Sequence, residues 1–200
     1  MLNATTLKTA VRAISRTMKV NRQYLIELDQ RNGDGDLGIS MDEGFAAACR
    51  FVDTSTETDL GKLLIGASKA FNEAAPSSLG TIMSLCMMGM ARVLKGHETA
   101  DAALLGEAFT GGVNKIMERA NSKPGEKTVL DALDPAARAL CAHASEGMAA
   151  ALRYAAGAAR AGSVISATFG ESLMNTGSLV AVLMARVYSS TFSGDWATSA

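Results

Sequence analysis

The chain has 200 residues, 48% of them hydrophobic and only 5% aromatic, and its formal charge of −1 reflects nearly equal numbers of acidic and basic residues. This length and apolar content can bury one substantial core, and the absence of a long basic stretch argues against nucleic acid as a partner. Abundant alanine, leucine and methionine with few β-branched runs favour helices, so we expect a single all-α domain over residues 1–200.

The cysteines and the hydropathy of the sequence indicate the cellular compartment of the protein. Cys49, Cys86 and Cys141 are an odd number set among apolar residues, which argues against a disulfide framework and fits a reducing cytoplasm. We expect all three to be buried. The longest apolar stretches, around Leu79–Met90 and Leu179–Ala185, are too short to span a bilayer, and the N-terminus lacks a signal-peptide pattern. The sequence therefore predicts a cytoplasmic protein with no membrane partner.

The first half of the chain reads as a series of helices. Apolar residues spaced by three or four positions predict a long amphipathic helix over 7–28. Ser40-Met41-Asp42-Glu43 has the pattern of a capping box, so the next helix should begin near Ser40. Thr56–Asp59 repeats this signal ahead of a helix over Leu60–Asn72, and a Pro-Ser-Ser sequence precedes another over Leu79–Leu94.

The second half continues the pattern. Thr99–Ala120 is periodic and ends before a Pro-Gly turn, after which Thr128–Asp131 predicts the cap of another helix. Arg138–Arg160 predicts one long helix or two, and Thr176–Tyr188 the last, with a Gly/Ser/Thr-rich loop between them. The count is about eight, and short connections predict an up-and-down arrangement whose loops gather at two ends.

Three carboxylates crowd one turn, where Asp29 is followed by Gly33-Asp34-Gly35-Asp36. Like charges at the carboxyl end of a helix repel one another and gain nothing from its dipole, so a hard cation is the expected reason for the cluster. We therefore interpret Asp29, Asp34 and Asp36 as metal ligands. The alternative is an acidic, solvated turn that only ends the helix.

The sequence of the acidic turn leaves two candidate metals, calcium and magnesium. The stretch from Asn32 to Glu43 approximates the calcium loop of an EF-hand, but Asn32 stands where that loop begins with Asp, and Leu37 stands where it has Gly. Magnesium commonly takes few protein carboxylates and completes its shell with water and substrate phosphates. Magnesium in a nucleotide site is thus the preferred interpretation, and calcium binding the less favoured one.

The acidic turn and several later motifs resemble the L subunit of dihydroxyacetone kinases. The further matches are Met41, Gly44-Phe45, Gly80-Thr81, and Pro124-Gly125-Glu126-Lys127-Thr128-Val129-Leu130-Asp131. The resemblance implies an eight-helix antiparallel up-and-down barrel with ADP or ATP bound at one end. It also implies that a pair of magnesium ions joins Asp29, Asp34 and Asp36 to the phosphates.

The same resemblance assigns further nucleotide contacts. A phosphate-binding segment of the family aligns with the start of the fourth helix, which implies contacts from Ser77, Ser78, Gly80 and Thr81. A helix N-terminus also suits an anion, although simple capping explains the two serines as well. By the same resemblance Thr128 lines the nucleotide site and Leu130 contacts the base, with a plain helix cap as the alternative for Thr128.

The resemblance implies a function shared between two chains. The L subunit carries the nucleotide, whereas dihydroxyacetone or a similar short keto-sugar sits on a separate K-type subunit, and a phosphocarrier protein is a second potential partner. The chain departs from the family in Gly162–Gly177, which contains no arginine, and in Leu37 and Ser40, which replace a histidine and an asparagine. Because arginine complements charge on a transferred phosphoryl group, a non-catalytic nucleotide-binding or regulatory module is the alternative. Self-association stays open.

Overall fold

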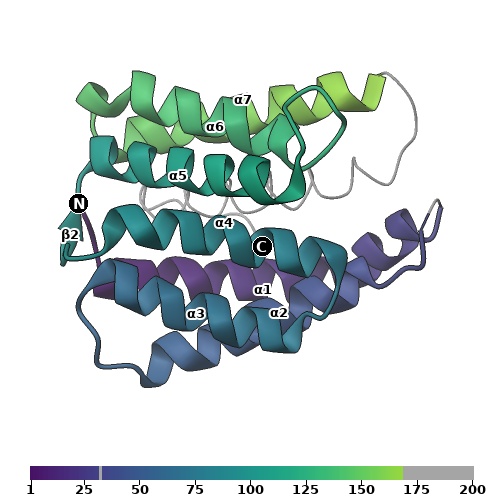
Figure 1. Cartoon of the computed structure of the whole chain (residues 1–200), viewed down its shortest axis with the longest axis horizontal. Coiled ribbons are helices and arrows are strands. Elements are labelled where there is room, and N and C mark those ends of the chain that lie inside the picture. The colour runs from purple at the N-terminus through teal and green to yellow at the C-terminus, as the bar shows by residue number, and fades with distance from the viewer. Residues whose placement is uncertain (32, 169–200) are drawn as a thin grey trace.

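The computed structural model describes residues 1–31 and 33–168, which are almost entirely helical (Figure 1). The elements are β1 (Leu2–Asn3), α1 (Ala4–Asp29), α2 (Leu37–Thr54), α3 (Leu60–Ala74), α4 (Ser78–Leu94), β2 (Thr99–Ala100), α5 (Ala102–Ala120), α6 (Leu130–Ala142), the 3-10 helix η1 (Ala144–Glu146) and α7 (Met148–Thr168). The predicted all-α class is confirmed, and within the described residues no helix has the length and apolarity needed to cross a membrane.

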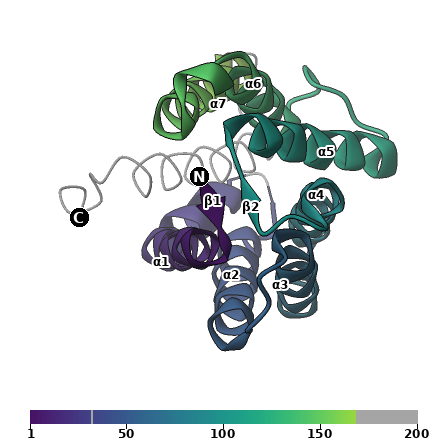
Figure 2. The same cartoon turned by 90° about the vertical axis from the view of Figure 1, so that its left-hand side faces the viewer.

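Each helix packs against the next one in the chain, and together they form an arc seen end-on in Figure 2. Because the connections are short, neighbouring helices run antiparallel. Helices α1, α3 and α5 therefore finish where α2, α4 and α6 begin, and we call this the Asp29 end. At the opposite end, which we call the ribbon end, β1 pairs antiparallel with β2 and ties the start of α1 to the start of α5.

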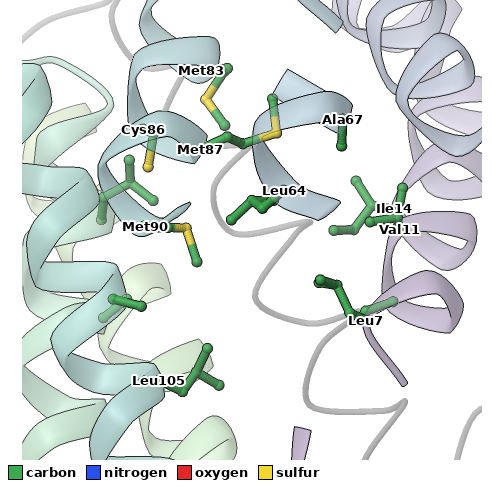
Figure 3. Close-up of a cluster of buried hydrophobic side chains, with 14 of the residues drawn as sticks. Leu7, Val11, Ile14, Leu64, Ala67, Met83, Cys86, Met87, Met90 and Leu105 are labelled. Atoms are coloured by element: carbon green, nitrogen blue, oxygen red, sulfur yellow. The ribbon is translucent and has the colours of Figure 1, made fainter. Parts of the chain in front are cut away.

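Long apolar side chains from several helices fill the inside of the arc. Figure 3 shows Leu7 and Ile14 of α1 and Leu64 of α3 converging with Met83 and Leu105 of α4 and α5, and all five are buried. At about 25 cal/mol per Å² of apolar surface removed from water, this burial is the main force holding the helices together. Flexible methionines suit the inside of such an arc because they fill irregular gaps.

Glycines allow the helices to approach closely. A side chain at Gly38 of α2 would collide with the backbone carbonyl of Arg22 in α1, and one at Gly89 of α4 would collide with the backbone of Gly111 in α5. Small residues at such crossings bring the two backbones together. Gly38 thereby fixes the start of α2 against the last turns of α1, the region where the acidic cluster lies.

Two predicted helix starts were wrong. Ser40 is not a cap: α2 begins three residues earlier, at Leu37, and Ser40 is buried inside the helix. Residues from Leu37 on are helical, so the longer loop of an EF-hand is not formed. Helix α5 begins at Ala102 rather than Thr99, because Thr99 is extended in β2 and the Asp101 side chain caps the helix by accepting from Leu104 N–H at 2.8 Å.

Two other predictions were partly wrong. Of the cysteines, all free thiols, Cys86 is buried, Cys49 is half-buried and Cys141 is exposed. The loop predicted over Gly162–Gly177 is helical as far as Thr168, because α7 continues through it, and its remainder lies outside the described residues. The predicted last helix, Thr176–Tyr188, also lies outside the described residues.

Candidate functional site

The turn between α1 and α2 brings the three aspartates together. Asp29 is the last residue of α1, and its carbonyl accepts from Gly33 N–H at 2.7 Å, which folds the chain back on the helix end. Gly35 has φ of +78°, a conformation that side chains disfavour, so glycine permits the tight turn between Asp34 and Asp36. Asp36 then stands directly before α2. The glycine-containing turn thus places three carboxylates between the end of α1 and the start of α2.

The carboxylates lie close enough to share a cation. One oxygen from each aspartate lies within 4.8 Å of the others, and Asp29 is only 3% exposed. Their backbone hydrogen bonds are long: Leu37 N–H donates to Asp29 and Asp36 N–H to Asp34, both at 3.4 Å. Burial, followed by the charges of Asp34 and Asp29, raises the pKa of Asp36 above its usual value. Oxygen donors crowded in this way suit a hard cation such as Mg²⁺ or Ca²⁺.

A cleft of about 500 Å³ opens beside the acidic cluster at the Asp29 end. Its lining comes from four of the helix ends that meet there, namely Asp29, Gly33, Asp34, Asp36, Leu37, Ser78, Leu79, Ile82, Ile116, Ala120, Ser122, Thr128 and Val129. Among the described residues, the acidic groups of the lining come from the end of α1 and the turn to α2, whereas the α4 and α5 contributions are mainly apolar. The cleft thus has one charged side and one apolar side, as a ligand with an anionic and an apolar part requires.

The far wall of the cleft is the connection from α5 to α6, which is shaped by a buried carboxylate. Helix α5 ends at Asn121 in the left-handed conformation, with φ of 48°. Asp131, in the first turn of α6, accepts from the N–H groups of Gly125 and Thr128. The Thr128 hydroxyl in turn accepts from Leu130 N–H at 3.2 Å. These bonds fix the loop and hold Thr128 and Val129 against the cleft.

Comparison with known proteins assigns the family. The sequence profile of the DAK2 domain matches residues 32–181 of this chain. The chain belongs to the DAK2 domain family. Asp29, which precedes the matched segment, is joined to it by the turn described above.

Relatives of this DAK2 domain include named kinases. An L-erythrulose kinase of Pectobacterium atrosepticum is 30% identical over 144 residues, which is 70% of this chain and 24% of that protein. The ADP-binding subunit DhaL of the PEP-dependent dihydroxyacetone kinase 1 of Listeria innocua is 30% identical over 60% of each chain. The chain thus spans less than two thirds of the length of these relatives.

Solved structures share the fold. The dihydroxyacetone kinase from C. freundii, solved in complex with AMP-PNP and Mg²⁺, superposes with a TM-score of 0.78 at 21% sequence identity. The superposition covers 94% of this chain and 34% of that one. The helical arc of this DAK2 domain is therefore the fold of part of that larger kinase.

The structure brings together some of the residues singled out from the sequence. Asp29, Asp34, Asp36, Ser78 and Thr128 all line the same cleft, although they come from three separate connections. This grouping agrees with the predicted arrangement, in which the metal ligands and the phosphate contacts share one end of the DAK2 domain.

Four other predicted nucleotide contacts do not line the cleft. Ser77 caps α4, its hydroxyl accepting from Gly80 N–H at 3.1 Å. Gly80 is required by packing, since a side chain there would collide with the carbonyl of Ala75. Thr81 lies in a separate groove on the outer side of α3 and α4, and Leu130 is fully buried in the core. Among the described residues these four therefore lie outside the cleft lining, and their contact with a nucleotide stays a prediction.

The structure also shows cleft residues that sequence reasoning missed. Ile82, Ile116 and Ala120 form much of the apolar side, and the periodicity of α4 and α5 gave no sign that a cleft borders this face, where Ile116 is also part of the buried core. Ser122 lines the cleft too, and its buried hydroxyl has no hydrogen-bond partner among residues 1–31 and 33–168. Buried hydroxyls are usually satisfied, so this one is unusual.

Proposed function

We propose that this DAK2 domain is the ADP- or ATP-binding subunit of a dihydroxyacetone-kinase-like phosphotransferase. Asp29, Asp34 and Asp36 hold magnesium ions, and the nucleotide occupies the cleft beside them. The observation that carries the proposal is the convergence of three carboxylates at the mouth of a two-sided cleft. Two similar proteins, an ADP-binding subunit and a kinase solved with AMP-PNP and Mg²⁺, support the same ligands.

The arrangement suits a magnesium nucleotide. Magnesium, when bound, would neutralise the carboxylates and bridge them to phosphate oxygens, which supplies the charge stabilisation that phosphoryl transfer requires. Ser78 is the first residue of α4, a helix of 17 residues, so its N-terminal dipole favours a phosphate at this position. The Thr128 side of the cleft, held by Asp131, closes around the remainder of the ligand.

The sugar is supplied by a partner in this proposal. The chain matches 24% of the L-erythrulose kinase and 34% of the C. freundii kinase, so only a part of each of those proteins is compared with it. We assign dihydroxyacetone, or a similar short keto-sugar, to a separate K-type subunit that docks at the Asp29 end. The phosphoryl donor is ATP or a phosphocarrier protein that recharges bound ADP.

Isothermal titration calorimetry tests the nucleotide proposal. The wild-type protein should bind ADP when Mg²⁺ is present and lose that binding when Mg²⁺ is chelated. The double variant Asp34→Asn, Asp36→Asn should not bind Mg·ADP measurably. A matched control is Asp53→Asn, which removes a surface carboxylate that pairs with Arg12 at 2.7 Å at the ribbon end, and it should bind normally. Equal binding by all three proteins would overturn the proposal.

A second function is favoured by one observation, the lack of arginine in Gly162–Gly177. A domain that keeps the metal and nucleotide site without this cation would serve as a non-catalytic nucleotide-binding or regulatory module. An assay of dihydroxyacetone phosphorylation with a K-type subunit and Mg·ATP separates the two. Turnover supports the kinase subunit, whereas tight Mg·ADP binding without turnover supports the regulatory module. Binding of Ca²⁺ alone, in preference to Mg²⁺ with nucleotide, would favour calcium binding instead.

A further inference from the structure

Ser122 lines the cleft, and its buried hydroxyl has no hydrogen-bond partner among the described residues. A buried, unsatisfied polar atom costs free energy, so such an atom inside a binding cleft points to a ligand group that completes it. The neighbouring cleft residue Thr128 differs in this respect, because its hydroxyl already accepts from Leu130 N–H.

The position of Ser122 in the arc decides which part of a ligand it meets. The acidic cluster lies on the α1–α2 turn, whereas Ser122 lies just after the C-cap of α5, and the start of α4 lies between them in the order of the helices. A nucleotide whose phosphates are held at the aspartates and at Ser78 must extend past α4 toward α5. The end farthest from the phosphates then lies beside Ser122.

The walls around Ser122 suit a flat, apolar group. Ile116 and Ala120 on α5 and Val129 before α6 line this side of the cleft together with Ile82 of α4. Such side chains contact the faces of a heteroaromatic ring, and one placed hydroxyl can bond to a polar atom on its edge. Ribose and phosphate, which carry many polar atoms, are poorly matched to this wall.

We infer that the Ser122 hydroxyl hydrogen-bonds to the base of the bound nucleotide and is a specificity-determining group of this site. The inference rests on the proposed function, since it requires a nucleotide in the cleft. It adds a residue to which neither the acidic motif nor the Pro-Gly segment points. A serine hydroxyl both donates and accepts, so it can serve either kind of atom on the base edge.

Calorimetry with two ligands tests this assignment. Mg·ADP carries the base, whereas Mg·pyrophosphate carries only the phosphate part, so Ser122→Ala should weaken the first and leave the second unchanged. Loss of one neutral hydrogen bond predicts a decrease in Mg·ADP affinity of roughly three- to tenfold. Ser145→Ala is the matched control, because Ser145 is an exposed serine in η1 that does not line the cleft, and it should bind both ligands as the wild type does.

Each other outcome overturns the inference. Unchanged Mg·ADP affinity in Ser122→Ala would show that the base does not use this hydroxyl. Equal weakening of both ligands, accompanied by a lower melting temperature of the ligand-free variant, would assign Ser122 a structural role in the loop. Failure of the wild-type protein to bind Mg·ADP at all would refute the proposed function itself, and this result is read before any variant is compared.

Discussion

Aspartates at the two ends of the helical arc have opposite environments. At the ribbon end, Asp59 accepts from Lys62 N–H at 2.9 Å and from Gly96 N–H at 2.8 Å. At the Asp29 end, the backbone hydrogen bonds to the clustered carboxylates among the described residues are 3.4 Å long, and one oxygen of each carboxylate lies within 4.8 Å of the others. Aspartate thus links two helices through backbone hydrogen bonds at the ribbon end, whereas at the Asp29 end three aspartates bring their negative charges together.

The electrostatics follow this difference. Burial opposes ionisation of Asp59, but hydrogen bonds from the N–H groups of Lys62, Gly96 and Gly61 outweigh it and lower its pKa. Burial and the charges of Asp34 and Asp29 raise the pKa of Asp36. A carboxylate with full backbone partners needs no ligand, whereas the cluster is arranged for a cation to complete it. This contrast is the physical basis for placing function at the Asp29 end.

The largest difference in Mg·ADP affinity should appear when the same substitution, Asp to Asn, is made at each end of the arc. Asp29→Asn keeps the shape of a buried side chain but removes its charge, and it should reduce Mg·ADP affinity by more than roughly 100-fold, since even residues behind a metal ligand change affinity by 10- to 100-fold. Asp59→Asn should change it by less than about twofold, because the site is distant. Titration calorimetry on both variants measures this, and similar losses in the two would erase the contrast.

The next effect concerns the loop that forms the far wall of the cleft. Asp131→Ala leaves the N–H groups of Gly125 and Thr128 without their carboxylate, and hydrogen bonds to a charged group contribute about 1.5–3 kcal/mol each. With two such bonds we expect a stability loss of roughly 3 kcal/mol or more in urea unfolding. Asp134→Ala, which removes only the ion pair with Arg138, is the control and should cost below about 1 kcal/mol. Equal losses would mean that Asp131 does not organise the loop.

A smaller effect is expected at the ribbon end itself. Asp59→Ala removes the cap of α3 and should lower stability at pH 7 by about 1 kcal/mol. Because the folded-state pKa of Asp59 lies below its ordinary value of 3.8, the stabilisation is present above that pH and is lost as the pH falls below it. Denaturation of both proteins as a function of pH should show the difference shrinking under acid conditions. A difference independent of pH would contradict this assignment.

The smallest expected effect is a gain in stability rather than a loss. Asp36→Asn removes one of three mutually repelling charges, so the metal-free protein should become more stable, by roughly 0.5 kcal/mol or less for an exposed group. Thermal melting in a chelating buffer measures this change. A lower melting temperature would show that Asp36 has a stabilising role in the turn, and the contrast between the two ends would weaken.

Much of this arrangement was predictable from local patterns. The periodicity from Leu7 to Leu28 gave α1, and the acidic turn gave a cluster whose members do lie together. The start of α2 was misplaced because Ser40 matched a capping pattern, whereas the glycine turn lets the helix begin at Leu37 and buries Ser40. A local pattern cannot reveal that competing turn. That residues 1–200 form one domain, and which residues bind ligand, stay predictions.

The apolar side of the cleft was not predictable because it depends on tertiary packing. Ile82 and Ile116 have the periodicity of core residues, and Ile116 is itself buried in the core. Only the relative positions of α4, α5 and the following loop place a cleft beside them. Ser122 belongs to no motif that the sequence analysis identified. Its environment depends on the left-handed residue that ends α5 and on the hydrogen bond from Thr128 N–H to Asp131, which the sequence does not show. Thr81 and Leu130 were themselves predicted as nucleotide contacts, but Thr81 lines another groove and Leu130 is buried in the core.

A crystal structure with ADP and Mn²⁺, located by its anomalous scattering, tests the central claim most directly. The account predicts metal peaks bonded to carboxylate oxygens of Asp29, Asp34 and Asp36, with phosphate oxygens on the same ions and the base beside Ser122. Metal bound elsewhere, or ADP seated without contact to these aspartates, would contradict it.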